Sequence, residues 1–185
     1  MYYSDFLAVL GGWTSLFYFY LVASLVILLD QLSKWWILHS FELGESMPVI
    51  DGFFMITSHR NKGAAFGILQ DQRTFFIIIT IVIVIGLIWY LAKSALDRKN
   101  LLAFSLSLIL GGALGNFIDR VRMGEVVDFL HFRFRFSWFG TEVDYSYPIF
   151  NLADSAICIG VALVFLDTFL EWRKERKRRK AYETP

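Results

Sequence analysis

TFFIIITIVIVIGLIWYL, residues 74–91, contains no charged side chain. The hydrocarbon core of a bilayer is about 30 Å thick and needs roughly 20 mostly apolar residues per helix. This stretch therefore predicts a helix that spans a membrane. The whole chain agrees with that interpretation, because 56% of its 185 residues are hydrophobic and its mean hydropathy is +0.52. An ordinary soluble domain is less apolar.

Three further apolar runs surround this one, at residues 12–38, 101–118 and 147–170. Together the four runs predict an all-α integral membrane protein with four transmembrane helices. We expect one membrane domain, residues 1–172, followed by a basic tail at 173–185.

Positive charge is unevenly distributed, although the net charge is only +1. An even number of spans places both termini and the connection at residues 93–100 on one side of the membrane. That side holds ten of the 18 Lys and Arg residues, namely Lys93, Arg98, Lys99, Arg173, Lys174, Arg176, Lys177, Arg178, Arg179 and Lys180. The positive-inside rule makes that side cytoplasmic. Residues 1–10 lack Lys and Arg, so we expect no cleaved signal peptide.

The two longer connections, residues 39–73 and 119–146, then lie outside the cytoplasm. Each contains a segment in which apolar and aromatic residues alternate, at 49–57 and at 129–138. Such alternation is typical of short strands or interfacial segments. We expect a small extracytoplasmic β-rich cap.

Polar residues within the predicted spans form three groups, and each group shares one helix face. The groups are Asp30 with Lys34, then Asn116 with Asp119 and Arg120, then Asn151 with Asp154 and Ser155. The order of the spans brings all three groups to the extracytoplasmic edge of the bilayer. Ionisable residues in spans are costly and often functional, so this convergence predicts a polar pocket there.

The inventory of reactive side chains restricts the chemistry of this pocket. No Gly-x-Ser turn is present, and the three histidines lack the spacing of zinc ligands. The one cysteine, Cys158, lies in an apolar run and is interpreted as a small hydrophobe. Two adjacent carboxylates, one protonated and one ionised, can hydrolyse a peptide bond with no cofactor and no metal. Asp128, which follows the third span, is placed at the level of Asp154.

Four motifs follow one another along the chain: DQxxK at 30–34, NxGAAFG at 61–67, GGALGNxxDRxxxGxVVDF at 111–129 and FNxADS at 150–155. These segments closely resemble those of the lipoprotein signal peptidase (signal peptidase II) family. They occur in the order of the family and extend over most of the chain between Asp30 and Cys158. One departure is the segment 131–147, which is longer than in a compact member and adds two carboxylates, Glu142 and Asp144.

The resemblance implies a bacterial inner-membrane aspartyl endopeptidase that cuts prolipoproteins before a diacylglyceryl-modified cysteine. It also implies membrane lipid and the signal peptide as partners, inhibition by globomycin-type peptides, and no nucleic acid. In this reading Asp128 and Asp154 are the catalytic dyad. The supporting residues Asn61, Asn116, Arg120 and Asn151 would hold the substrate backbone or the dyad by hydrogen bonds. The small residues Gly63 and Ala64 would let the backbone approach a ligand closely. Asp30, Lys34 and Asp119 would anchor the fold.

Several positions also have structural interpretations. Asp30 and Lys34 suit a structural ion pair four residues apart. Asp119 suits a fold-holding acceptor with its neighbour Arg120 as partner, and Arg120 itself suits either the substrate or lipid phosphates. At the level of the whole protein, a small proton- or ion-coupled transporter subunit and a non-catalytic scaffold remain as alternatives. A transporter site would favour polar residues near the bilayer midplane.

Overall fold

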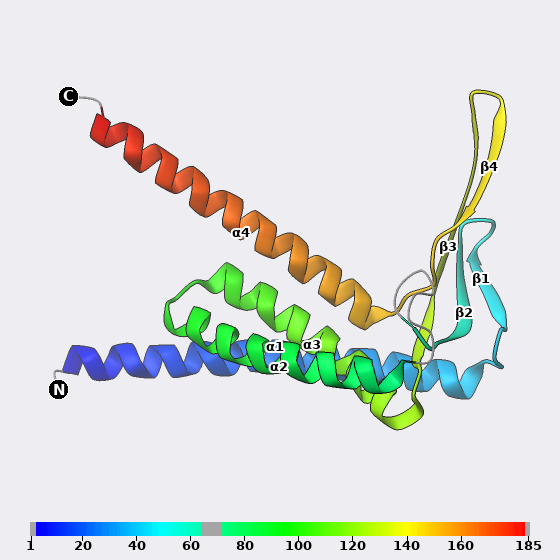
Figure 1. Ribbon diagram of the computed structural model, residues 1–185, viewed down its shortest axis with the longest axis horizontal. Helices are drawn as coiled ribbons and strands as arrows, with labels where there is room; N and C mark the ends of the chain where they lie inside the picture. The colour runs from blue at the N-terminus through cyan, green and yellow to red at the C-terminus, as the bar shows by residue number, and fades with distance from the viewer. Residues whose placement is uncertain (1–2, 64–71, 184–185) are drawn as a thin grey trace.

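Four long helices and one four-stranded sheet form the computed structural model, which describes residues 3–63 and 72–183 (Figure 1). The helices are α1 (Tyr3–Ser40), α2 (Arg73–Leu96), α3 (Asn100–Met123) and α4 (Leu152–Glu183). Each contains a segment that is long and apolar enough to cross a membrane: Ser15–Ser40, Arg73–Leu96, Asn100–Met123 and Leu152–Arg179. The predicted set of four spanning helices is confirmed.

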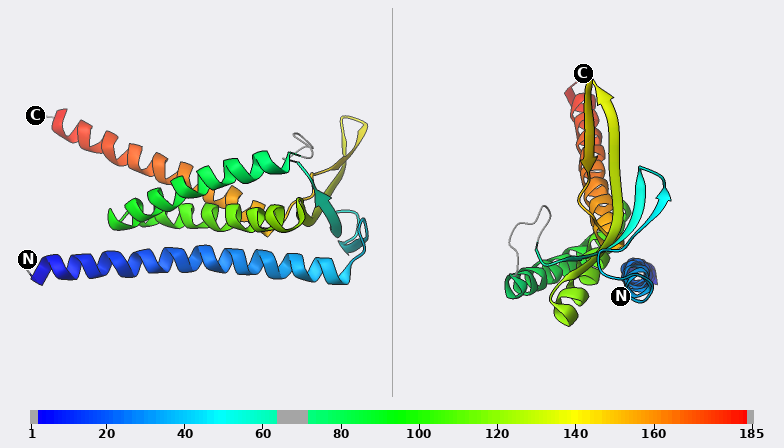
Figure 2. Two further views of the ribbon diagram at one scale, coloured as in Figure 1. Left: turned by 60° about the horizontal axis from the view of Figure 1, so that its bottom comes forward. Right: turned by 90° about the vertical axis from the view of Figure 1, so that its right-hand side faces the viewer.

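Helix α3 is the centre of the bundle and packs against α1, α2 and α4 (Figures 1 and 2). In its apolar window 56% of the residues are buried, against 17% or less in the other three. Glycines allow this close packing, because a side chain at Gly111 would meet Val26 of α1 and one at Gly112 would meet Ala153 of α4. Most apolar residues of the outer helices therefore remain available to lipid.

The sheet lies at one end of the bundle and confirms the expected β-rich cap (Figure 2). Its strands are β1 (Ser46–Ile50), β2 (Phe54–Asn61), β3 (Val126–Trp138) and β4 (Thr141–Ser146), and they pair antiparallel in sequence order. The segment predicted at 49–57 is divided between two strands. A turn at residues 51–53 separates them, with Gly52 at a φ of 73°.

The fourth helix begins later than predicted, at Leu152 instead of residue 147. The preceding residues are extended because they pair with β3: Tyr147 N–H donates to the Phe132 carbonyl at 2.8 Å, and Phe150 exchanges hydrogen bonds with Leu130. These residues are apolar, and hydropathy alone does not separate a strand from a helix. The helix also continues through the predicted basic tail to Glu183, since Lys, Arg and Glu are good helix formers.

The junction between α3 and β3 carries the chain from the bundle into the sheet. Gly124 ends α3 in the left-handed conformation at a φ of 80°. The Arg73 guanidinium satisfies the helix end by donating to the carbonyls of Arg120 and Val121 at 2.9 and 2.6 Å. Beyond the turn, Val127 packs against Ile37 of α1 in a small apolar cluster. This packing fixes the start of β3 over the helix ends.

Candidate active site

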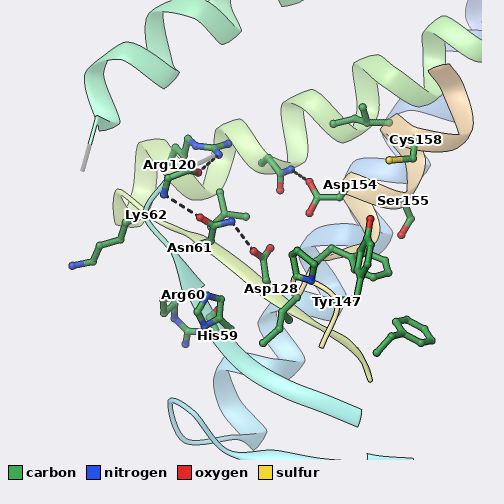
Figure 3. Close-up of a pocket in the computed structure, with 18 of the residues that line it drawn as sticks. His59, Arg60, Asn61, Lys62, Arg120, Asp128, Tyr147, Asp154, Ser155 and Cys158 are labelled. Atoms are coloured by element: carbon green, nitrogen blue, oxygen red, sulfur yellow. Dashed lines mark hydrogen bonds between the residues drawn. The ribbon is translucent and has the colours of Figure 1, made fainter. Parts of the chain in front are cut away.

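A cavity of about 980 Å³ lies where the sheet meets the ends of α3 and α4 (Figure 3). Strands β2 and β3 supply one wall, and Asn116 and Arg120 of α3 supply another. The start of α4 supplies a third wall, including Asp154 and Cys158. Asp128 and Asp154 are the two carboxylates among the described residues that line the cavity, and both point into it (Figure 3). The predicted polar pocket is therefore present.

Asp128 is a nearly inaccessible carboxyl group, with 1% of its surface exposed. It lies on β3, and each of its oxygens accepts one amide hydrogen bond, from Asn151 Nδ2 at 2.7 Å and from Asn61 Nδ2 at 3.0 Å. Burial, and then the negative charge of Asp154, raises its pKa from 3.8 to about 7, although both amide bonds act in the opposite direction. Asp128 can therefore hold a proton at neutral pH.

Asp154 is oriented by a capping box at the start of α4. Its backbone N–H donates to Asn151 Oδ1 at 2.9 Å, while its own Oδ2 accepts from the Asn151 backbone N–H at 3.2 Å. Reciprocal bonds of this kind satisfy two of the free N–H groups at a helix start. The other oxygen of Asp154 accepts from Asn116 Nδ2 at 2.7 Å.

Asn151 connects the two carboxyl groups. Its backbone N–H holds Asp154, and its side-chain amide holds Asp128, while Asn151 itself is fully buried. The same amide also donates to Asn116 Oδ1 at 3.1 Å. One residue thus sets the positions of both aspartates relative to each other.

A second layer of buried charge supports the backbone next to each aspartate. Asp30 accepts from the N–H of Ala153, which precedes Asp154, at 3.0 Å. Asp119 accepts from the N–H of Val127, which precedes Asp128, at 3.3 Å.

Lys34 joins these two supports, with its ammonium group 2.8 Å from Asp30 and 2.8 Å from Asp119. It also donates to Asn116 Oδ1 at 2.9 Å. The predicted ion pair of Asp30 and Lys34 is thus present, but the predicted partner of Asp119 is wrong. Asp119 pairs with Lys34 because its helix face turns toward α1, whereas Arg120 turns toward the cavity.

Arg120 and Gly63 hold the end of β2 at the cavity. Arg120 donates to the Gly63 carbonyl at 3.3 Å, and its guanidinium stacks over the Phe76 ring at 4.7 Å. The N–H of Gly63 donates to Asn61 Oδ1 at 3.0 Å, which directs the Asn61 amide toward Asp128. Ala64, which the motif also suggested, lies outside the described residues.

Sequence reasoning missed several residues that line the cavity, among them His59, Arg60 and Tyr147. His59 could have been found from Asn61, since alternate residues of a strand share a face. Glu142 and Asp144, the two additional carboxylates of the segment 131–147, lie on the β3–β4 hairpin and are not among the residues that line the cavity. They therefore do not compete with Asp128 and Asp154 for the catalytic role.

Within residues 3–63 and 72–183, no group of three or more His, Cys, Asp or Glu side chains is placed to hold a metal ion. The groups that donate hydrogen bonds to Asp128 and Asp154 are side-chain amides and one backbone N–H group, which bind carboxylates and not cations.

Comparison with known proteins gives a consistent picture. The family model of signal peptidase (SPase) II matches residues 22–170. The chain belongs to the signal peptidase II family.

Relatives of the signal peptidase II family match almost over their full length. The lipoprotein signal peptidase of Bacillus pumilus is 51% identical over 160 residues, which cover 86% of this chain and 97% of the relative. That of Halalkalibacterium halodurans is 48% identical over 163 residues, which cover 88% and 99%. A bacterial membrane enzyme solved by the in meso method at 2.3 Å superposes with a TM-score of 0.70 at 45% identity, over 82% of this chain and 87% of the other.

Membership in the signal peptidase II family has direct consequences. It gives the chain lipoprotein signal peptidase activity of the aspartic type, in a multi-pass bacterial membrane protein. The transporter and scaffold alternatives receive no support from these comparisons.

Proposed function

We propose that this chain hydrolyses diacylglyceryl-modified prolipoproteins directly before the lipidated cysteine, with Asp128 and Asp154 as the catalytic dyad. The observation that carries the proposal is the pair of carboxyl groups that Asn151 holds in one cavity at the end of the spanning helices. A scissile bond near a lipid anchor must be cut at the membrane surface, because the anchor leaves the bilayer only at high cost.

The proposed mechanism begins with one proton on the dyad. Asp154 is the ionised base that accepts a proton from water, and Asp128 is the acid that donates its proton to the carbonyl oxygen. Water oxygen bonds to the carbonyl carbon and a tetrahedral intermediate forms. Its collapse breaks the C–N bond, and a proton passes from the dyad to the leaving amine of the cysteine. The raised pKa of Asp128 and the donors around Asp154 support this assignment.

The remaining cavity residues are proposed to bind the substrate. Arg120 and the amides of Asn61 and Asn116 offer hydrogen-bond donors to peptide carbonyls, while Phe132 and Ile157 offer apolar walls. A globomycin-type cyclic peptide would occupy the same cavity. The cavity volume of about 980 Å³ suits a ligand of the size of such a peptide.

The proposed orientation places both termini in the cytoplasm and the sheet on the extracytoplasmic side of the inner membrane. The support is the charge distribution, because the last turn of α2, the α2–α3 connection and the end of α4 together carry ten of the 18 Lys and Arg residues. In this orientation the basic segment at the end of α4 would contact the anionic lipids of the cytoplasmic leaflet.

The test is cleavage of a diacylglyceryl-modified prolipoprotein by the purified protein in detergent. We expect cleavage before the modified cysteine, loss of cleavage in both Asp128→Asn and Asp154→Asn, and inhibition by globomycin. Asp97→Asn is the matched control, because Asp97 is an exposed carboxylate in the connection at the opposite end of α3. Retained turnover in a folded Asp128→Asn or Asp154→Asn protein would refute the dyad.

A further inference from the structure

The β3–β4 hairpin has two chemically different faces. Cross-strand pairing places Phe134 opposite Tyr145 and Phe136 opposite Val143 on one face. These side chains form an apolar face that is unusually open, since Phe134, Phe136 and Tyr145 are 38%, 47% and 48% exposed. Phe134 contacts the Phe53 ring, while Phe136 and Tyr145 farther along the hairpin leave an apolar surface open.

The opposite face of the hairpin is polar. It pairs Arg135 with Asp144 and Ser137 with Glu142. Arg133 and Arg135 both form ion pairs with Asp144 at the water-exposed surface. The Arg133 guanidinium accordingly lowers the pKa of the Asp144 carboxyl. This face is therefore fully compatible with water.

The apolar face continues the wall of the active-site cavity. Asp128, Phe132 and Phe134 are alternate members of β3 and all line the cavity. Phe53 packs against Phe132 and Phe134 with ring centroids 5.5 and 5.6 Å apart. An aromatic surface thus runs from the aspartate along the strand and onto the hairpin beyond the cavity.

The spanning helices determine where the bilayer lies relative to this surface. The hairpin runs across the helix ends instead of along them, so it extends parallel to the membrane surface (Figure 1). Seen end-on, the hairpin and α4 extend toward the same side of the molecule (Figure 2). Phe134 lines the cavity together with Asp154 and Cys158 of α4, so the face of β3 that carries Phe134 is turned toward the spanning helices.

We propose that the β3–β4 hairpin is a membrane-contact arm whose apolar face, Phe134, Phe136, Val143 and Tyr145, lies on the headgroup layer of the leaflet at the sheet end. Aromatic side chains are favoured in that layer. The charged face then points away from the membrane. The proposal rests on the spans and on the two faces of the hairpin, and it does not depend on the peptidase mechanism.

The test measures the environment of single spin labels in the full-length protein. Cysteines replace Phe136 or Val143 on the apolar face, and Ser137 or Glu142 on the polar face, in a Cys158→Ser background. The labelled proteins are reconstituted in vesicles of phosphatidylethanolamine and phosphatidylglycerol. Collision rates with oxygen, which partitions into lipid, are compared with those of a water-soluble nickel chelate.

We expect the Phe136 and Val143 labels to collide more often with oxygen than with the nickel chelate. The Ser137 and Glu142 labels, on the neighbouring cross-strand pair, should show the reverse order. Water-like ratios at all four positions would overturn the proposal. So would dipolar broadening between Phe136 labels, which would indicate a second copy, or shielding that appears only after substrate is added, which would indicate peptide docking.

Discussion

Replacing Asp128 with asparagine should abolish cleavage. The effect of this substitution on the free energy of unfolding should also be more favourable at high pH than at low pH. The carboxyl has a pKa of 3.8 in an unstructured chain and about 7 in the folded protein. The folded protein therefore binds a proton more tightly than the unfolded chain does. Its stability falls as the pH rises from about 4 to about 7, and an amide cannot ionise, so the substitution removes this loss.

The magnitude follows from the two pKa values of Asp128. Relative to acidic pH, where the carboxyl is protonated in both states, the raised pKa lowers the free energy of unfolding by about 2 kcal/mol at pH 5, where only the unfolded chain ionises, and by about 4 kcal/mol at pH 8, at 1.36 kcal/mol per pKa unit. The effect of Asp128→Asn should thus be more favourable by about 2 to 3 kcal/mol at pH 8 than at pH 5. The new NH2 group places a donor against the donating amide of Asn61 or Asn151. This mismatch lowers the free energy of unfolding by about 1–3 kcal/mol at both pH values, so it cancels in the comparison.

The assay is thermal unfolding of the wild type and the variant in one detergent at pH 5 and at pH 8. The difference corresponds to roughly 5–10 °C in Tm for a chain of this size. Asp144→Asn is the control. The pKa of this exposed carboxyl shifts in the opposite direction to that of Asp128, because Arg133 lowers it. Its stabilisation is fully present at both pH values, so its effect should not depend on pH between them. An Asp128→Asn effect that is equal at pH 5 and pH 8 would refute the raised pKa.

Three further predictions concern the pH profile, the buried charge network and the helix packing. Cleavage should fall as the pH rises through about 7, because the dyad loses its proton with Asp128; an initial-rate profile flat from pH 6 to pH 9 would contradict this. Lys34→Met should destabilise the protein by about 3–5 kcal/mol, since two buried carboxylates lose their cation; unfolding in SDS measures this, and an unchanged midpoint would contradict it. Gly112→Ala should lower the free energy of unfolding by about 1–3 kcal/mol, because the methyl group meets the Ala153 carbonyl. The control is Gly86→Ala, at a position with open space around it. Equal unfolding midpoints for the two variants would contradict the prediction.

The arrangement of supports explains why the aspartates can be placed accurately on two separate elements. Asp128 belongs to a strand and Asp154 to a helix, so each could shift with its own element. Asn151 bonds to both, and Lys34 joins the two carboxylates that hold the preceding backbone N–H groups. Catalytic geometry needs such support, since small displacements of reacting groups reduce rates strongly.

The pattern of the chain was sufficient for the membrane architecture and the level of the site. Hydropathy is a property of short stretches, so the four spans could be predicted without knowledge of contacts. Helical periodicity placed Asp30 with Lys34, and Asn151 with Asp154, on shared faces. The family motifs then singled out Asp128, although it lies outside any span.

The partners of those residues could be decided only by the tertiary structure. Asp119 is adjacent to Arg120 in the chain, yet it pairs with Lys34 of a different helix. The late start of α4 depends on pairing between Phe150 and Leu130.

The two-faced hairpin depends likewise on the register of β3 against β4. Burial, register and hydrogen-bond choice depend on residues that are distant in sequence. The sequence by itself therefore determined which residues reach the membrane edge, whereas the fold determined which of them meet.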